Sequence, residues 1–471
     1  MIDTAALKSR ILEQAFRGNI TKRYTDDENA RILYTKLVNN NKISHIESVE
    51  ELYEIPETWK WISLENVGKW GAGATPSRKV KDYYGGNIPW LKTGDLNDGM
   101  ITDIPEYITE LALKETSVKL NPVGSVLIAM YGATIGKLGI LEVEATTNQA
   151  CCACSTYEGI YNKYLFYYLM SQRDRLRYMG SGGAQSNISK EKIVGYCFPL
   201  APYAEQIRVV NAIETIFAEL DKIEKLQLHY SVNLEILKSK IINAGIQGKL
   251  TEQLPEDGTA EELLEQIEIQ KNTILKNRKG RVDKKIKAID GDFPYEIPSH
   301  WKWIRFGNIG LFKKGPFGSA LTKSMFVPKG ENTVKVYEQQ HAINKDNTLG
   351  TYYITREYFD DSMSGFEVLP GDIIVSCAGT IGETYIMPDD IEQGIINQAL
   401  MRVTLAEGVN RKFFQYYFDA NLKKSAKNES NGSAIKNIPP FDVMKNWYFP
   451  IPPLEEQERI VEKIENILTI L

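Results

Sequence analysis

The chain carries two strongly apolar runs of strand length, each closed by a glycine turn. They read GSVLIAMYGATIG from Gly124 and GDIIVSCAGTIG from Gly371. Because apolar and β-branched residues fill both runs, the pattern predicts a buried strand followed by a turn in each. An aromatic segment follows each run, KYLFYYL from Lys163 and KFFQYYF from Lys412, and we expect it to form a helix. The same order of elements occurs twice, which predicts a duplicated domain.

Two further segments set the size of the repeat. YEIPETWKWISLENVG from Tyr53 recurs as YEIPSHWKWIRFGNIG from Tyr295, and Asn-Gln-Ala from Asn148 recurs from Asn397. The spacing between the copies is far longer than the period of a solenoid or propeller and suits a whole domain. The spacing drifts slowly along the chain, as small loop insertions would cause.

A long helix is expected between the two copies. FPLAPYAEQIRVV from Phe198 and FPIPPLEEQERIV from Phe449 both lead from prolines into a helical pattern. Residues 204–243 contain no Gly or Pro, which predicts a helix roughly 60 Å long at ~1.5 Å per residue. Burial of this helix inside one large domain is the alternative. Apolar residues at steps of three and four predict a coiled-coil seam made of Ile213, Phe217, Leu220, Ile223, Leu226, Tyr230, Leu234, Leu237 and Ile241.

The two ends of the chain also belong to the repeat. LKSRILEQAFRGNIT from Leu7 is similar to LKSKIINAGIQGKLT from Leu237, so the chain opens with the end of a repeat and closes with the beginning of one. We therefore predict an α+β fold, in which two globular domains of mixed α/β structure in pseudo-twofold arrangement are separated by long antiparallel coiled-coil helices, as a circularly permuted repeat. The predicted segments are an N-terminal helical segment that pairs with the C-terminal helix (1–45), a first globular domain (46–203), a central helix and connector (204–283), a second globular domain (284–453) and a C-terminal helix (454–471).

Composition is that of an ordinary globular protein. The chain has 471 residues, of which 43% are hydrophobic, enough for packed cores. No apolar run approaches the roughly 20 residues of a membrane helix, and the start lacks a signal-peptide pattern. The five cysteines form no spaced disulfide framework, which suits a reducing compartment. We expect a cytoplasmic protein.

The run CCAC from Cys151 aligns with apolar residues of the other copy, which favours small core residues over zinc ligands.

The net charge of −5 argues, by itself, against a nucleic-acid partner. The charges are unevenly distributed, however. Acidic residues gather at 252–268 and 455–465, and basic residues gather at 78–92, 276–287 and 313–323. This layout suits a protein with one DNA-binding face and one protein-binding face, although ordinary solvated charge explains any single cluster equally well.

Three further motifs carry a family resemblance. They are GAGATPSRKVKDYYGGNIPWLKTGDL from Gly71, KKGPFGSALT from Lys313 and SGGAQSNISKEKI from Ser181. Together with the doubled, permuted order of segments, they make the chain resemble the specificity subunit of Type I restriction-modification enzymes over essentially its whole length. The segment around Lys313 has little in common with the matching segment from Gly71. This divergence implies that the two domains recognise different DNA half-sites.

The resemblance implies a non-catalytic subunit of a restriction endonuclease and adenine methyltransferase complex. Two target-recognition domains would each read one half of a bipartite, asymmetric site in double-stranded DNA. The helices would dock two methylation subunits, and restriction subunits would join through the complex. The partner subunits would use S-adenosylmethionine, ATP and magnesium, and this chain is expected to bind no cofactor and no metal.

Candidate DNA-binding residues follow from the chemistry of base and phosphate recognition. Polar side chains on loops read base edges, and Lys and Arg contact phosphates. In the first domain the candidates are Thr75, Ser77, Arg78, Lys79, Lys81, Lys92, Gln185, Ser186 and Asn187. In the second domain they are Lys313, Lys314, Ser319, Thr322, Lys323, Gln339, Gln340, His341 and Lys436. Solvated loop residues without a ligand are the alternative at each position.

Catalytic interpretations have weaker support. GATIGKLG from Gly132 has three rather than four residues before Gly136-Lys137, and a leucine follows where a phosphate loop needs Ser or Thr. NIPPF from Asn437 has an isoleucine between the amide and the prolines of a methyltransferase motif. Two alternatives to the favoured function stay open, a self-contained DNA methyltransferase and a coiled-coil protein scaffold without DNA binding.

Overall fold

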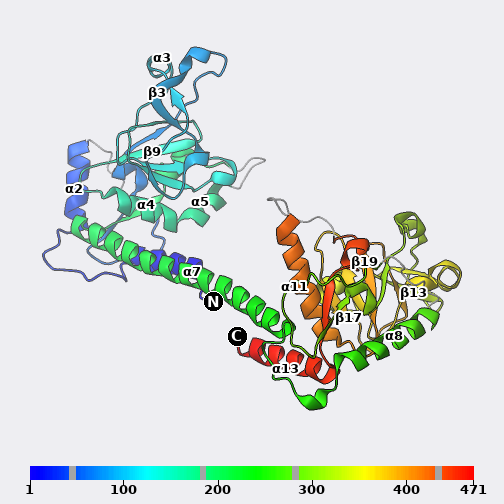
Figure 1. Cartoon of the computed structure of the whole chain (residues 1–471). Helices are drawn as coiled ribbons and strands as arrows, with labels where there is room; N and C mark the ends of the chain where they lie inside the picture. Colours follow the sequence, from blue (N-terminus) through cyan, green and yellow to red (C-terminus); the bar gives the residue numbers. More distant parts are fainter. Residues whose placement is uncertain (42–48, 181–186, 278–285, 430–437) are drawn as a thin grey trace. The chain divides into compact units, whose positions relative to one another are not determined.

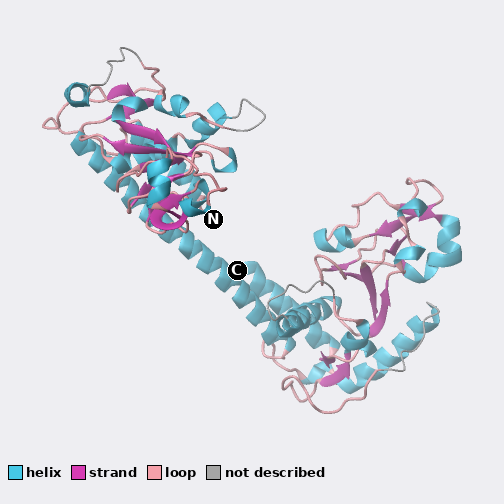
Figure 2. Ribbon diagram, turned by 90° about the horizontal axis from the view of Figure 1, so that it is seen from above, coloured by secondary structure: helices cyan, strands magenta, loops and turns pink. Residues whose placement is uncertain are grey.

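The duplicated apolar runs form the central strands of two sheets. In the computed structural model, which describes residues 1–41, 49–180, 187–277, 286–429 and 438–471, they are β6 (Val126–Ala129) and β16 (Ile373–Ser376), and every residue of both strands is buried. The chain divides into two compact units, residues 1–229 and 230–471. The boundary falls inside the longest helix, α7 (Tyr203–Ile246). Each unit combines helices and strands, as predicted (Figures 1 and 2).

The first unit contains a five-stranded sheet, a three-stranded sheet and a strand pair. The five-stranded sheet has the order β2-β9-β6-β7-β4, the three-stranded sheet β5-β3-β8, and the pair is β1-β10. The strands are β1 (Lys60–Ser63), β2 (Gly68–Ala72), β3 (Tyr84–Leu91), β4 (Gly99–Ile101), β5 (Tyr107–Ile108), β7 (Leu138–Leu141), β8 (Thr146–Thr147), β9 (Cys151–Thr156) and β10 (Cys197–Leu200). The helices are α1 (Thr4–Phe16), α2 (Ala30–Asn41), α3 (Glu110–Glu115), α4 (Asn162–Ser171), α5 (Arg173–Gly180) and α6 (Lys190–Val194).

The second unit repeats this arrangement, with two four-stranded sheets in place of the five- and three-stranded ones. Its sheets have the orders β12-β19-β16-β17 and β14-β13-β18-β15, and its strand pair is β11-β20. The strands are β11 (Lys302–Arg305), β12 (Gly310–Lys314), β13 (Thr333–Tyr337), β14 (Tyr353–Thr355), β15 (Glu367–Val368), β17 (Thr384–Ile386), β18 (Gly394–Ile396), β19 (Leu400–Leu405) and β20 (Tyr448–Ile451). The helices are α8 (Ala260–Asn277), α9 (Gln339–Asn344), α10 (Arg356–Tyr358), α11 (Arg411–Glu429), α12 (Phe441–Met444) and α13 (Leu454–Ile470). The duplication predicted from the sequence is confirmed.

A buried glutamate joins the helix to the globular part in each unit. Glu205 is fully buried, accepts a 2.8 Å hydrogen bond from Trp59 Nε1, and lies 3.3 Å from the hydroxyl of Thr21. In the second unit Glu456 has matching partners, Trp301 Nε1 at 2.8 Å and a threonine hydroxyl at 3.3 Å, and in addition His300 Nε2 at 2.8 Å. Because buried carboxylates need such donors, the Glu-Gln motif at each helix start has a structural role.

The glutamine that follows completes this joint. The Gln206 amide donates to the carbonyls of Ala201 and Gly159, at 2.9 and 3.1 Å, and accepts from a backbone N–H at 2.9 Å. The Gln457 amide makes the matching bonds to Pro452 and Gly408, at 3.0 and 2.9 Å. Each helix start is therefore fixed by its side-chain amide to the loop before the aromatic helix.

An arginine–aspartate pair adds to each joint. The Arg459 guanidinium binds both carboxylate oxygens of Asp257 at 2.6 Å, and Arg208 holds Asp27 in the same way. The hydrogen bonds from each arginine lower the pKa of its aspartate. The pairs join the helix to the segment that precedes α8 in one unit and α2 in the other.

Asp257→Asn is expected to lower the free energy of unfolding at neutral pH by about 1–3 kcal/mol, the usual contribution of hydrogen bonds to charged groups. The folded pKa lies below the ordinary value of 3.8, so the stabilisation is present above that value and is lost as the pH falls through it and below. The difference between the native chain and the variant should therefore be constant above about pH 5 and shrink as the pH falls below about 4. Urea unfolding at several pH values measures it, with Asp27→Asn as the matched variant of the first unit. A difference that does not change with pH would contradict this assignment.

The terminal helices pack against α7 within their own units. Beside α1 (dark blue in Figure 1), the Ile2 N–H donates to Gln227 Oε1 and Lys8 Nζ lies 2.5 Å from Asp221, so α1 and α7 run antiparallel. In the second unit, α13 packs against the end of α7, where isoleucines of α13 approach Gly245. Each terminal helix therefore partners one half of the central helix.

The predicted seam is covered only toward the two ends of α7. Ile213 and Leu220 are buried, and Phe217 packs on the core of the first unit, while Ile241 packs on the core of the second. Ile223 and Leu234 are half-buried. Leu226, Tyr230 and Leu237 are exposed, at 66%, 62% and 42%. The predicted helix is confirmed, and the middle of its seam faces solvent in this chain.

The CCAC run lies in the core of the first unit. Cys151, Cys152 and Cys154 on β9 are fully buried, and burial raises the pKa of the Cys152 thiol to about 12. Their interpretation as core residues is confirmed. In the described part of the chain, no helix is long and apolar enough to cross a membrane.

Candidate nucleic-acid interface

The strand register brings several loops of the first unit to one edge of its main sheet. Ala72 at the end of β2 pairs with Cys152, and Ala129 at the end of β6 pairs with Cys151, so these ends lie beside the start of β9. The loops that meet there are 73–83, 130–137 and 148–150. We call this the strand-end edge. Loops on a rigid sheet commonly carry binding residues.

The second unit has an equivalent strand-end edge. Lys314 at the end of β12 pairs with Met401, and Ser376 at the end of β16 pairs with Leu400. The loops that meet are 315–332, 377–383 and 397–399. Loop 315–332 differs from its counterpart in the first unit, while the Asn-Gln-Ala turn and the glycine turn are repeated.

The glycine turn at the first edge is held by two arginines of α5. Arg173 Nε donates to the Gly136 carbonyl at 2.8 Å, and its Nη2 lies 2.5 Å from Asp98 Oδ1. Arg177 Nε donates to the Ile135 carbonyl at 3.0 Å. The turn is part of the sheet edge, fixed through its carbonyl groups, in agreement with the rejection of a phosphate loop.

Arg78 and Lys92 meet at one carboxylate. Arg78 Nη2 lies 3.0 Å from Glu106, and Lys92 Nζ binds the other carboxylate oxygen. These bonds, that of Lys92 foremost, lower the pKa of Glu106. The Arg78 guanidinium also lies 4.4 Å from the ring centroid of Tyr84 and 5.4 Å from that of Trp90. The arginine is thus held in one orientation while its side chain stays 59% exposed, and two cations share a single anion.

The other candidates of the first unit surround this cluster on the loop after β2. Thr75 is exposed and its hydroxyl donates to Gln149 Oε1. Ser77, Lys79 and Lys81 are exposed as well. All of them lie where solvent, and therefore DNA, can reach the side chain.

In the second unit the basic candidates also face solvent. Lys313, Lys314, Ser319 and Lys323 are exposed. The ammonium group of Lys313 lies 4.6 Å from the ring centroid of a phenylalanine. Thr322 is half-buried, and its hydroxyl lies 2.9 Å from a serine hydroxyl in the same loop.

His341 belongs to the interior of the second unit, contrary to its selection as a base reader. Its side chain is fully buried. Its Nδ1 accepts from the Glu338 N–H at 2.8 Å, and its Nε2 lies 2.7 Å from the Leu349 carbonyl, so both ring nitrogens are engaged. Half-buried Gln339 donates to the Ala378 carbonyl at 2.6 Å, which leaves Gln340 as the exposed member of the three. His341 fixes the start of α9 and cannot contact DNA from this position.

The loop after α5 is described only in part. Gln185, Ser186 and Lys436 lie outside the described residues. Asn187 is exposed and pairs with Tyr131 of the glycine turn in an antiparallel bridge. The strand-end edge of the first unit therefore includes Asn187.

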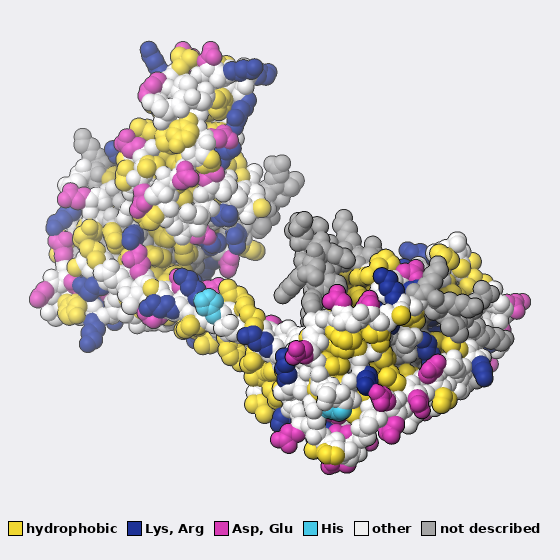
Figure 3. Space-filling model, in the orientation of Figure 1, with side chains coloured by type: hydrophobic (Ala, Val, Ile, Leu, Met, Phe, Trp, Pro, Cys, Tyr) yellow, Lys and Arg dark blue, Asp and Glu magenta, His cyan; other side chains and the backbone are white. Residues whose placement is uncertain are grey.

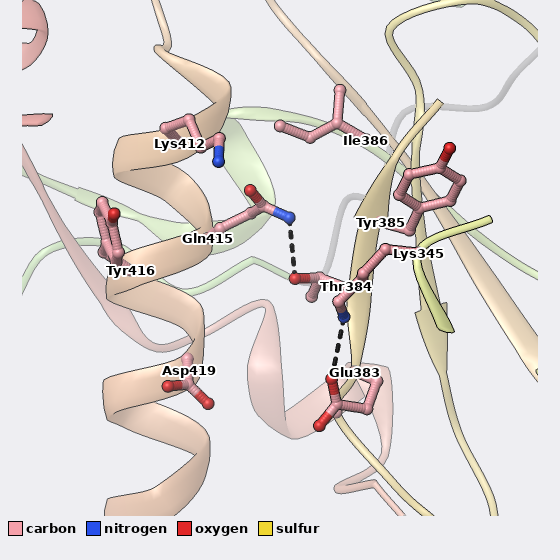
Figure 4. Close-up of a pocket in the computed structure, with 10 residues that line it drawn as sticks. Lys345, Glu383, Thr384, Tyr385, Ile386, Lys412, Gln415, Tyr416 and Asp419 are labelled. Carbon is pink, nitrogen blue, oxygen red and sulfur yellow. Dashed lines mark hydrogen bonds and ion pairs between the residues drawn. The ribbon is translucent and has the colours of Figure 1, made fainter. Parts of the chain in front are cut away.

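A polar pocket of the second unit lies between β17 and α11 (Figure 4). Lys345 Nζ lies 2.9 Å from Glu383 Oε2, and Gln415 Nε2 donates to Thr384 Oγ1 at 2.9 Å. The second lysine of the pocket, Lys412, lies 3.4 Å from a glutamate of α13. Both lysines are paired with carboxylates, so the pocket has no excess charge that would select a ligand.

Four residues at the two edges were not among the sequence-based candidates. Glu106 organises the basic cluster, Phe317 is 88% exposed beside Lys314, and Gln149 and Gln398 face solvent from matching turns. The repeated Asn-Gln-Ala segment was a usable signal for the glutamines. No local pattern marks Glu106, because its partners are distant in sequence.

Comparison with protein families gives one match that covers both units. The model described as Type I restriction modification DNA specificity domain matches residues 56–233 and 318–471. Both strand-end edges lie largely within these ranges.

Curated proteins of the same kind are similar to the chain. The EcoR124I/EcoR124II specificity subunit of Escherichia coli is 31% identical over 161 residues, which are 33% of this chain and 40% of that protein. The MjaIX specificity subunit of Methanocaldococcus jannaschii is 29% identical over 41% of this chain and 46% of its own length. These two matches span less than half of each relative. The Escherichia coli EcoAI specificity subunit is 20% identical, over 98% of this chain and 88% of the relative.

Two solved structures share the fold. A chain from a study of complex assembly and conformational transition of the type I R-M system has a TM-score of 0.62 at 16% identity, covering 89% of this chain and 92% of that one. The HsdS subunit from Thermoanaerobacter tengcongensis has a TM-score of 0.53 at 16% identity, with the same coverage.

Proposed function

The chain belongs to the Type I restriction modification DNA specificity family, and from this premise we propose that it is the non-catalytic DNA-recognition subunit of a Type I restriction-modification complex. Each unit reads one half of a bipartite, asymmetric site in double-stranded DNA. The observation that carries the proposal is the pair of strand-end edges, which have a similar backbone frame and, apart from Gln149 and Gln398, different exposed side chains. Recognition of two unlike half-sites requires the same backbone scaffold in both units with different base-contacting side chains.

Sequencing of modified bases in cells that carry the chain and its modification subunits tests the proposal. We expect a methylated motif of two short half-sites separated by a spacer of fixed length, which disappears when the gene for this chain is deleted. A genome without such a motif, or one whose motif survives the deletion, would refute the proposal.

The exposed basic residues are proposed to contact phosphates. Lys323→Ala should weaken binding of the assembled complex to all duplexes alike and reduce the slope of log K against log salt by about one. Titrations of labelled duplex at several salt concentrations measure both effects. The control variant is Lys302→Ala. Lys302 lies on β11 and is ion-paired with Glu261 of α8. Unchanged affinity and slope for Lys323→Ala would exclude a phosphate contact, and a loss confined to one base pair would indicate base readout.

We propose that α7 docks two methylation subunits through its exposed apolar side chains (yellow along this helix in Figure 3). Leu226, Tyr230 and Leu237 lie on the face of the seam, and Leu228, Val232 and Ile236 follow one another at steps of four on a second face. Apolar side chains on an otherwise polar helix are unusual for a surface that stays in water. Two such faces suit two copies of one partner.

The double variant Leu226→Glu/Leu228→Glu should reduce the amount of modification subunit that co-purifies with the chain by about tenfold or more, because two leucines lose their burial. The helical content should stay as it is, since both side chains are exposed in the free chain. The control is Ile269→Glu, which changes a 65% exposed residue on α8. Full recovery of the partner with the double variant would place its docking surface elsewhere.

The remaining chemistry is assigned to the partners. We propose that S-adenosylmethionine, ATP and magnesium are bound by the modification and restriction subunits and that this chain binds none of them. A cytoplasmic location follows from the same proposal, because the complex acts on chromosomal DNA.

A further inference from the structure

The repeated Asn-Gln-Ala segment forms the same turn in both units. The N–H of Asn148 donates to the Leu91 carbonyl at 2.9 Å, and its carbonyl accepts from the Cys151 N–H at 3.1 Å. In the second unit the N–H of Asn397 donates to the Tyr337 carbonyl at 3.0 Å, and its carbonyl accepts from the N–H three residues on, also at 3.1 Å. Each turn therefore links the sheet that contains β3 or β13 to the start of β9 or β19.

A glycine on the neighbouring strand lets each turn approach closely. A Cβ atom at Gly73 would lie 2.3 Å from the carbonyl oxygens of residues 147 and 148, and a Cβ atom at Gly315 would lie 1.8 Å from the Asn397 carbonyl. No other side chain fits at either glycine without moving the backbone. The same close contact therefore fixes the position of the turn in both units, although the neighbouring exposed loops differ.

The glutamine of each turn projects from this fixed frame into solvent. Gln149 and Gln398 are both exposed, so packing does not require either side chain. The residues beside them have diverged, with Thr75 next to Gln149 and Phe317 at the equivalent position of the second unit. An identical exposed residue between different neighbours points to a ligand feature that both half-sites share.

The hydrogen bonding of Gln149 defines that feature. The Thr75 hydroxyl donates to Gln149 Oε1 and occupies one of the two acceptor positions of that oxygen. The Nε2 group can offer its two N–H groups to a ligand, and such a donor suits a phosphate oxygen. The sugar–phosphate backbone is also the part of DNA that is the same in every half-site.

We propose that Gln149 and Gln398 bind equivalent backbone phosphates in the two half-sites and so set the register in which each unit meets its DNA. This inference rests on the proposed DNA-recognition function. The glutamines are positioning residues, and the diverged neighbours on the same edges supply the sequence readout.

Binding of the assembled complex to labelled duplexes at several salt concentrations tests the proposal. Gln149→Ala and Gln398→Ala should each weaken binding about three- to tenfold on cognate and unrelated duplexes alike, with an unchanged salt slope, because a neutral side chain displaces no counterion. Gln149→Lys and Gln398→Lys should bind at least as tightly as the native chain and steepen the slope by about one, because lysine adds one phosphate-neutralising charge. A purely structural role would not produce this pair of responses.

Gln253→Lys serves as the control, since Gln253 is an exposed glutamine far from both edges in sequence. It should change neither affinity nor slope, and an equal gain from it would overturn the proposal as a general charge effect. Loss of discrimination at one base pair in the alanine variants would overturn it in favour of base reading, and unchanged binding in all four variants would overturn it outright. A native complex that shows no salt-dependent binding would instead refute the DNA-recognition function itself.

Discussion

Exchange of residues 49–200 for the matching domain of a relative is expected to replace one half of the recognised DNA site and to leave the other half unchanged. Each changed base pair should cost about 1–3 kcal/mol of discrimination, so the exchange abolishes recognition of the original first half-site. Modified-base sequencing of cells that carry the chimera reads out both half-sites at once.

The strand pairing explains why the exchange should preserve the fold. β1 and β10 are antiparallel neighbours, with Lys60 opposite Leu200, so the chain enters and leaves the domain at adjacent points. The exchanged part packs on α1, α2 and α7, where the Trp59 indole reaches Glu205 and the ring of Tyr164 lies 5.1 Å from that of Phe16. A donor that keeps Trp and Tyr at these two positions should therefore join the existing core.

The matched exchange in the second unit is residues 291–451, bounded by the β11–β20 pair in the same way. It should alter the second half-site only. A chimera that is folded, assembles with its partners and changes both half-sites would show that the units do not read DNA independently. If neither chimera accumulates in cells, the exchanged domains have failed to fold on the remaining helices. Donors that retain the Trp and Tyr positions are chosen to prevent this failure.

Sequence periodicity predicted the repeated elements well, because their signals are local. The buried runs became β6 and β16, and the prolines before the Glu-Gln motifs mark the starts of α7 and α13. The permutation could also be predicted, since α1 repeats the end of α7 and α13 repeats its beginning. These features depend on residues that are close together in the chain.

The roles of single side chains at the edges were less predictable, because they depend on distant partners. Arg78 meets Glu106 only through the register of β3 and β5, and His341 turned inward to hold α9 although its polar neighbours suggested a surface loop. The seam of α7 reads as continuous in sequence, yet Leu226 and Tyr230 are exposed, because periodicity does not show where a partner helix stops.

Substitution of Gly248 tests the close packing of the permuted joint. Gly248 has a φ of +70°, and a Cβ atom there would lie 2.4 Å from Pro298 Cγ and 3.0 Å from the Trp301 ring. Gly18 repeats this arrangement in the first unit, with a φ of +75° and Pro56 Cγ at 2.4 Å. Both prolines precede the tryptophans that bind the buried glutamates. A displaced proline would therefore disturb the joint between helix and domain.

Gly248→Ala is expected to lower the free energy of unfolding by about 2–4 kcal/mol, of which about 1–2 kcal/mol comes from the left-handed backbone and the rest from overpacking. Gly18→Ala should have a similar effect in its own unit. Gly291→Ala isolates the backbone term, because Gly291 has a φ of +85° and nothing within 4 Å of the added carbon. Urea unfolding of the three variants compares them directly. If Gly248→Ala costs no more than Gly291→Ala, close packing of the proline on the glycine does not contribute to the stability of the joint.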